Sequence, residues 1–211
     1  MRDVSVMGVQ GEETAVPVLV DGLPASLRLA TQDGWVEAGD LEAGDPVLTF
    51  EQGERVVRQV FRSAQAPRLP QTFWPVCLPE GAFDNDHPVE LLPAQMVMLE
   101  SDLAEDVFGE PFVMVPAVAL CGWNGIVRSA PREVEIVHLQ FDRPQVVFAG
   151  RSLLLGCGGT GALAANAFAA PGMMTLNVAA ARQLVAGLIR EGERARLYAP
   201  AQAALAAEKR L

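Results

Sequence analysis

The segment TQDGWVEAGDLEAGDPVLTFEQG, residues 31–53, decides the fold. A strand ends in an Asp-Gly turn that leads to Trp35, and a short acidic turn, GDLEAGD, then leads into the apolar strand VLTF. Asp45 is expected to cap the backbone of the acidic turn with its short carboxylate. Gly44 is expected to supply the unusual φ that such a turn often needs. This segment predicts short extended strands joined by tight, capped turns.

Short apolar stretches with an extended pattern continue on both sides of this segment, from residue 4 to about residue 155. Turn residues such as Asn124-Gly125 separate them. The expected strands are Val4–Val9, Ala15–Val20, Leu27–Thr31, Pro46–Phe50, Arg55–Arg62, Phe73–Leu78, Pro88–Leu92, Met96–Leu99, Phe112–Val115, Glu133–Phe141 and Gln145–Phe148. Many short strands with few helices predict a mainly β fold.

The last third of the sequence has a different character. Apolar residues at helical spacing predict an amphipathic helix from about Leu176 to Arg190, with Asn177 as its cap. A second, alanine-rich helix is expected from Pro200 to about Lys209. The predicted organisation is an N-terminal extension (1–21), a β-domain (22–155), a Gly/Ala-rich linker (156–174) and C-terminal helices (175–211).

Charge and residue counts exclude several classes of function. The 211-residue chain has 26 acidic and 16 basic residues, a formal net charge of −10, which argues against binding to nucleic acid. Its single lysine, Lys209, argues against Schiff-base and P-loop chemistry. Two histidines and three cysteines without a CxxC pair predict neither a metal site nor a disulfide framework. Unpaired cysteines favour a reducing compartment, so we expect a cytoplasmic protein.

Membrane and cofactor signals are also weak. The N-terminus lacks a sustained apolar core, and the charge-free stretch 152–181 consists mostly of small residues, so no membrane segment is expected. The sequence GCGGTG, residues 156–161, formally matches G-x-G-x-x-G, but no acidic residue lies about 20 positions on, as a dinucleotide site needs. The acidic residues within 100–110 lack the spacing of a calcium loop. We therefore predict no cofactor.

Three blocks of the sequence carry a family resemblance. Residues 31–53 closely resemble the signature T-x-x-G-W-x-x-V-x-D-L-x-x-G-D-x-V-L-T of Hint domains, the hedgehog/intein module. LLPAQMVML, residues 91–99, resembles the block V-S-P-Q-H-R-V-L-L of the bacterial Hint subfamily, and residues 116–126 with 134–150 look like its closing strands. The resemblance spans roughly Gly22 to Gly150. It implies a pseudo-twofold β-fold, with the C-terminal helical extension outside it.

The resemblance also implies a self-processing chemistry. In such domains a Cys or Ser at the first position attacks the preceding carbonyl and forms a thioester or ester. A Thr-x-x-His element polarises that peptide bond, and its histidine transfers a proton. An external nucleophile or a downstream residue then captures the intermediate.

The residues needed for this chemistry are replaced in the present sequence. Alignment places the nucleophile on Gly22, the polarising Ser/Thr on Leu92, its histidine on Gln95, and the histidine of F-D-R-H on Pro144. None of these side chains can attack a carbonyl or exchange a proton near neutral pH. Ser26 is a nearby hydroxyl, but a shift of four residues along a strand is roughly 13 Å.

Two further residues allow two interpretations. His138 and Asp142 lie four apart and would share a strand face, as a relic of a proton-relay pair. Alternatively, His138 is a core histidine, and Asp142 caps the following turn with Arg143. His87 does not fit the family spacing and is expected to be a partly exposed histidine at a strand edge.

The sequence therefore predicts a stand-alone Hint-like domain that has lost autoprocessing and binds an unknown protein or peptide along a sheet edge. The amphipathic helix is expected to pack on the core or to exchange with another subunit in a homo-oligomer. The alternative is a residual self-cleaving enzyme that acts near Gly22–Ser26, using Ser26 or the pair His138 and Asp142.

Overall fold

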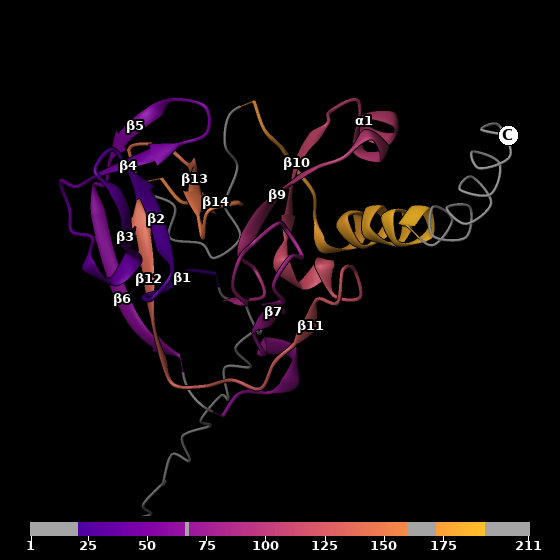
Figure 1. Ribbon diagram of the computed structural model, residues 1–211, viewed down its shortest axis with the longest axis horizontal. Helices are drawn as coiled ribbons and strands as arrows, with labels where there is room; N and C mark the ends of the chain where they lie inside the picture. The colour runs from indigo at the N-terminus through magenta and orange to yellow at the C-terminus, as the bar shows by residue number, and fades with distance from the viewer. Residues whose placement is uncertain (1–20, 66–67, 160–171, 193–211) are drawn as a thin grey trace, which may run out of the picture.

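The computed structural model describes residues 21–65, 68–159 and 172–192 (Figure 1). The strands are β1 (Leu23–Pro24), β2 (Arg28–Thr31), β3 (Gly34–Glu37), β4 (Pro46–Thr49), β5 (Gly53–Val56), β6 (Gln59–Gln65), β7 (Val76–Leu78), β8 (Val89–Leu91), β9 (Met96–Glu100), β10 (Phe112–Pro116), β11 (Val127–Arg128), β12 (Val134–Gln140), β13 (Gln145–Ala149), β14 (Leu153–Cys157) and β15 (Met174–Thr175). The α-helix α1 spans Asp102–Phe108, short 3-10 turns span Ala38–Asp40, Gln71–Phe73 and Ala117–Leu120, and a further helix covers 178–192.

The strands form three sheets. β1, β12 and β6 make one, in that order, and β11, β7 and β8 make another. The remaining nine strands form the largest sheet, in which β13 joins β14 to the N-terminal strands β2 and β4. In Figure 1, β12 lies beside β6, far from it in sequence, and the two pair over seven positions from Val134↔Gln65 to Gln140↔Gln59. The predicted mainly β class is confirmed.

The acidic turn of residues 38–46 has the predicted cap. The Glu42 N–H donates a hydrogen bond to Asp45 Oδ2 at 2.8 Å, and Gly44 has a φ of 108°. Both predictions about this turn are confirmed. The turn returns the chain from β3 into β4 and so begins the hairpin of β4 and β5.

A single main core connects the β-domain with the C-terminal helix. Leu29, Val47 and Leu155 are fully buried in it, and the helix 178–192 contributes Leu184 and Val185 to the same cluster. The Ala180 N–H donates to Asn177 Oδ1 at 3.0 Å, so the predicted amphipathic helix and its asparagine cap are confirmed. The apolar face of this helix, for which the sequence did not identify a partner surface, packs on the chain's own core.

One long predicted strand is interrupted. The sequence indicates a single strand over Arg55–Arg62, but β5 ends at Val56 and β6 begins at Gln59. The Val57 N–H donates to Asp45 O at 2.9 Å, and the Arg58 N–H donates to Gln140 O at 2.7 Å. The chain changes partner here from β4 to β12, and apolar patterning alone does not mark such a change.

Several expected elements lie wholly or partly outside the described residues. The strands predicted at 4–9 and 15–20, the helix predicted at 200–209 and most of the predicted linker lie outside the described residues. The first two residues of that linker, Gly156 and Cys157, complete β14. Among the described residues, no helix combines the length and apolar character needed to cross a bilayer.

Candidate functional site

Gly22 lies immediately before β1 in a position without room for a side chain. It is buried, and its φ of 124° is one that residues with a side chain rarely adopt. A Cβ built on Gly22 would lie 2.5 Å from Ile136 Cγ2 and 2.8 Å from His138 Cε1. The position that the family resemblance assigns to the nucleophile is therefore filled by the side chains of β12.

Gln95 faces Gly22 across the interior. The Gly22 N–H donates to Gln95 Oε1 at 3.2 Å, and Gln95 Nε2 donates to the carbonyls of Gly156 and Met96 at 2.8 and 3.2 Å. The side chain is only 2% exposed. The structure thus brings together two aligned positions that are 73 residues apart, but it joins them by an amide that cannot transfer a proton.

His138 lies with Gly22 rather than with Asp142. Its Nδ1 is 3.9 Å from Asp21 Oδ1, and its ring borders Gly22. The Asp142 carboxylate instead accepts two hydrogen bonds from Arg58, at 2.7 and 2.9 Å. The hydrogen bonds from Arg58 and its positive charge hold the pKa of Asp142 below its ordinary value. The structure does not bring the two suggested relay residues together.

Cys157 is a neighbour of this site that the sequence did not reveal. Its backbone neighbour Gly156 accepts a hydrogen bond from Gln95. Burial, with a smaller contribution from the charge of Asp21, raises the pKa of the Cys157 thiol to about 12. The thiol therefore stays protonated near neutral pH, which makes it a poor nucleophile. Nothing in its local sequence signals this location, because it depends on the pairing of β14 with β9 and β13.

The other aligned positions lie apart from this cluster. Leu92 is buried and borders a groove, and Ser26 is exposed on the same groove. Pro144 follows β12 and packs closely against Gly159, where an added Cβ would lie 2.8 Å from Pro144 Cδ. The structure places none of these three residues within the cluster of Gly22, Gln95 and His138.

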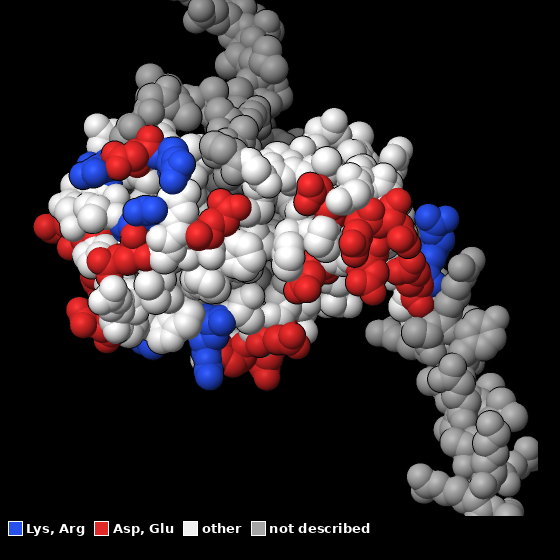
Figure 2. Space-filling model, turned by 90° about the horizontal axis from the view of Figure 1, so that it is seen from above, with Lys and Arg blue, Asp and Glu red and all other residues white. Residues whose placement is uncertain are grey.

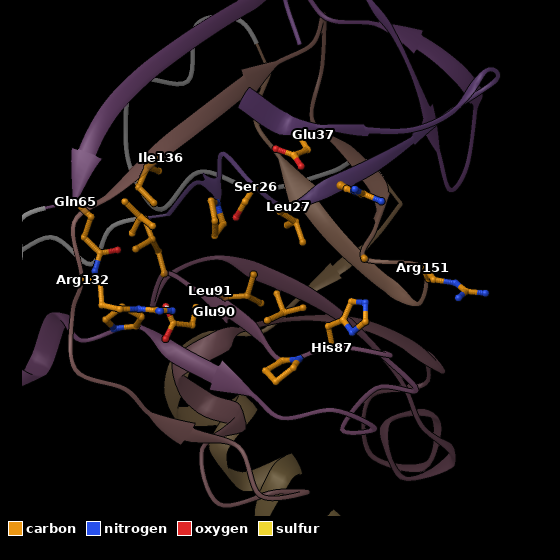
Figure 3. A pocket seen from close by; sticks show the side chains of 18 of the residues that line it. Ser26, Leu27, Glu37, Gln65, His87, Glu90, Leu91, Arg132, Ile136 and Arg151 are labelled. Atoms are coloured by element: carbon orange, nitrogen blue, oxygen red, sulfur yellow. The ribbon is translucent and has the colours of Figure 1, made fainter. Parts of the chain in front are cut away.

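A groove lies next to this cluster (Figure 3). It encloses about 500 Å³, within the range of small-ligand and peptide sites. Ile136, which contacts Gly22, also lines it. Figure 3 shows Ser26 and Leu27 on one wall, with His87 and Leu91 opposite them. The groove therefore adjoins the cluster of Gly22, Gln95 and His138 through Ile136.

Charges at the groove are balanced. Its lining includes three arginines and three carboxylates: Arg28, Arg132, Arg151, Glu37, Asp86 and Glu90. Arg132 pairs with Glu90 at 2.7 Å, and Arg151 pairs with Asp86 at 3.0 Å. The groove thus has no excess of either charge, in contrast to the acidic chain as a whole.

Acidic residues gather elsewhere, over α1. Figure 2 shows acidic side chains clustered on this part of the surface, which includes the run within residues 100–110. In the ranges that the structure describes, no three His, Cys, Asp or Glu residues are grouped closely enough to hold a metal ion. The acidic residues of this run therefore supply charge without forming a metal-binding cluster.

Comparison with known proteins identifies relatives of this architecture. A family model described as Hint domain matches residues 23–153. The chain is also similar to a bacterial intein-like domain from Clostridium thermocellum, with 14% identity and a TM-score of 0.41, over 64% of this chain and 98% of that one. For the MchDnaB-1 intein the values are 15% identity and a TM-score of 0.39, over 63% of this chain and 98% of the intein. No curated protein matches the chain.

Proposed function

Since this chain belongs to the Hint domain family, we propose that it is a Hint domain that has lost autoprocessing and serves as a binding module for a protein or peptide. The observation that carries this proposal is the packing at Gly22. Family chemistry starts from a side-chain nucleophile at that position. Here Ile136 and His138 occupy the space in which such a side chain would lie.

The surroundings of Gly22 support the same proposal. Gln95 keeps a hydrogen bond to the Gly22 N–H, so it holds the peptide bond in place. Its amide has no acid–base function near neutral pH, whereas the corresponding histidine would have one. What remains at this position is a structural contact that fixes the start of β1.

The groove supports a binding role. It adjoins the former catalytic position and combines apolar walls with a few polar groups, which is typical of recognition sites. Leu92, aligned with the polarising Ser/Thr, lines this groove and adds apolar surface to it. The substitution thus replaces a catalytic hydrogen-bond donor with a binding contact.

One contact favours the alternative, residual self-cleavage near Gly22–Ser26. His138 borders Gly22 and lies 3.9 Å from Asp21, so it could protonate the amine released if the 21–22 bond broke. Ser26 gives less support to this alternative, since it is exposed on the groove and no hydrogen bond joins its side chain to a base in the described residues. A serine nucleophile needs such an adjacent base.

Intact mass distinguishes the two functions. The purified full chain is weighed before and after incubation with dithiothreitol, a thiol that captures ester and thioester intermediates. The proposal expects one unchanged mass near 22.5 kDa. Loss of the first 21 to 25 residues would overturn it, and Ser26→Ala and His138→Ala would then show which side chain performs the cleavage.

The location and assembly of the module are part of the same proposal. We place it in a bacterial cytoplasm, where its three free cysteines stay reduced. A homo-oligomer through the C-terminal helix would use the exposed face of 178–192, or exchange of this helix between copies, because Leu184 and Val185 already face the core. Sedimentation velocity of the full chain tests this assembly.

A further inference from the structure

The outer edge of β6 has no strand partner within the described residues. β6 pairs with β12 at all seven of its positions, and no other described strand pairs with it. Four consecutive residues of β6, 61–64, are exposed, although neighbours along a strand point to opposite faces. Solvent therefore reaches both faces of β6 here, as it does at the edge of a sheet.

The pairing of β12 determines which backbone groups of β6 point to this edge. The Ala25 N–H donates to Glu135 O at 2.9 Å, so the backbone groups of Glu135 face β1. Because these groups alternate between the two sides of an antiparallel strand, the even-numbered residues of β12 face β6. Their register partners are the odd-numbered residues of β6. The N–H and C=O groups of Val60, Arg62 and Ala64 therefore face the open edge.

The side chains along this edge do not block pairing. Edge strands are commonly protected from other chains by a projecting charge or a proline. Val60 and Ala64 supply neither. Arg62 is charged, but its Nη2 donates to the carbonyls of Gly39 and Leu41 at 3.0 and 2.9 Å. The protein itself holds this guanidinium, so the edge can accept another strand.

The edge is complementary to a second copy of itself. Identical strands pair in antiparallel fashion about a two-fold axis. An axis at Arg62 places Val60 opposite Ala64 of the second copy, so every backbone group that faces the edge gains a partner. The same register places Phe61, which is 47% exposed, opposite Ser63 of the second copy. A large ring thus packs beside a small side chain and loses exposed apolar area.

This register also places the two Arg62 residues opposite each other. Like charges in that position are unfavourable when nothing compensates them. Within each copy, however, Arg62 Nε lies 3.9 Å from Glu135 Oε1, in addition to its bonds to the carbonyls of Gly39 and Leu41. Each positive charge is therefore compensated within its own copy.

We propose that two copies of this chain form a dimer through antiparallel pairing of their β6 edges, with the two-fold axis at Arg62. The pairing joins the sheets β1-β12-β6 of both copies into one continuous sheet. This inference goes beyond the proposed binding function and does not depend on it. It assigns the dimer to the β-domain, whereas a dimer through the C-terminal helix would leave the edge of β6 unpaired.

A proline at residue 64 tests the edge. The Ala64 N–H faces away from β12, so Ala64→Pro keeps the pairing with β12 and removes a donor that the dimer needs. Ala64→Ser keeps this donor and is the matched control. Sedimentation velocity of the full chain over a range of concentrations should show a dimer for the unaltered protein and for Ala64→Ser. Ala64→Pro should raise the dimer Kd about tenfold or more, and circular dichroism should show that it is still folded.

Phe61→Ser tests the packing without a change in the backbone. It should raise the dimer Kd about fivefold, because the exposed ring no longer contacts the second copy. Val107→Ser alters another exposed apolar side chain, on α1, and should leave this Kd unchanged.

Amide hydrogen exchange locates the interface. Exchange at Val60, Arg62 and Ala64 should slow as the protein concentration rises, because these amides pair only in the dimer. Phe61 and Ser63 pair with β12 and should be protected at every concentration. A chain that stays monomeric, or a dimer that Ala64→Pro and Phe61→Ser leave unchanged, would overturn this proposal. A dimer that instead protects the helix 178–192 would overturn it as well, and none of these outcomes bears on protein or peptide binding by the groove.

Discussion

At the scale of single residues, the site was partly predictable from the sequence. Alignment of short motifs assigned Gly22 and Gln95 to the same site, and their hydrogen bond of 3.2 Å confirms that they meet. The contact of Asp21 with His138 and the location of Cys157 were missed because both depend on strand pairing, which has no local sequence signal. The pairing of Asp142 with Arg58 was missed for the same reason, since the two residues are 84 positions apart.

Restoring a nucleophile at Gly22 is expected to fail. Gly22→Cys combines an unfavourable φ with contacts to Ile136 and His138, so it should lower the free energy of unfolding by roughly 3 kcal/mol. Urea denaturation measures this loss, and intact mass should show no cleavage. Gly34→Ala is the matched control: its φ is 123° but nothing lies within 4 Å of an added Cβ. It should cost only about 1–2 kcal/mol, and equal costs at both positions would contradict the role of packing.

Cys157 should be the protected thiol. Because burial raises its pKa to about 12, iodoacetamide at pH 8 should alkylate it only after unfolding, as peptide mass mapping would show. The unfolded chain releases this proton near the ordinary value of 9.0, whereas the folded chain holds it until about 12. Folded stability should therefore fall as pH rises through this window, and Cys157→Ala should reduce the fall. Rapid alkylation of native Cys157 would contradict this assignment.

At the scale of elements, alternation located most strands but not their partners. The strand expected at Met96–Leu99 is β9, Met96–Glu100, and the strand expected at Gln145–Phe148 is β13, Gln145–Ala149. β11 and β15 were not predicted, because each strand is only two residues long and is too short to show an alternating pattern of apolar and polar residues. Only their pairing with neighbouring strands defines them. The change of partner at Val57 was missed because it depends on hydrogen bonds from distant residues.

The cap of the C-terminal helix is a testable element. Asn177→Ala removes the side-chain acceptor for the Ala180 N–H and should cost about 1 kcal/mol of unfolding free energy. Urea denaturation followed by far-UV circular dichroism measures it. Gln183→Ala, at an exposed position in the same helix, should change stability by less than about 0.5 kcal/mol. An Asn177→Ala variant as stable as that control would show that the cap contributes nothing.

At the scale of the whole molecule, the folded unit extends beyond the family match. The matched region ends at residue 153, but the main core continues into Leu184 and Val185 of the helix 178–192. The helix is therefore expected to unfold together with the β-domain. The sequence predicted an amphipathic helix in need of a partner, but amphipathicity does not reveal which surface it covers.

Leu184→Ala tests this shared core. The side chain is 3% exposed, so its truncation should cost about 2–4 kcal/mol. Tryptophan fluorescence, which reports on Trp35, Trp74 and Trp123 in the β-domain, should show the same shifted midpoint as circular dichroism. A shift seen by circular dichroism alone would mean that the helix melts separately.

The packing at Gly22 also has an evolutionary consequence. On the proposed function, self-processing would need a nucleophile at 22, a proton-transferring residue at 95 and smaller neighbours on β12, and the first of these changes is expected to destabilise the fold by itself. Because selection removes variants that fall below the stability needed for function, the first of these substitutions is expected to be lost before the others can follow it. Exposed groove positions such as Ser26 carry no such constraint. On the proposed loss of autoprocessing, descendants of this protein are expected to acquire new partners far more easily than self-processing.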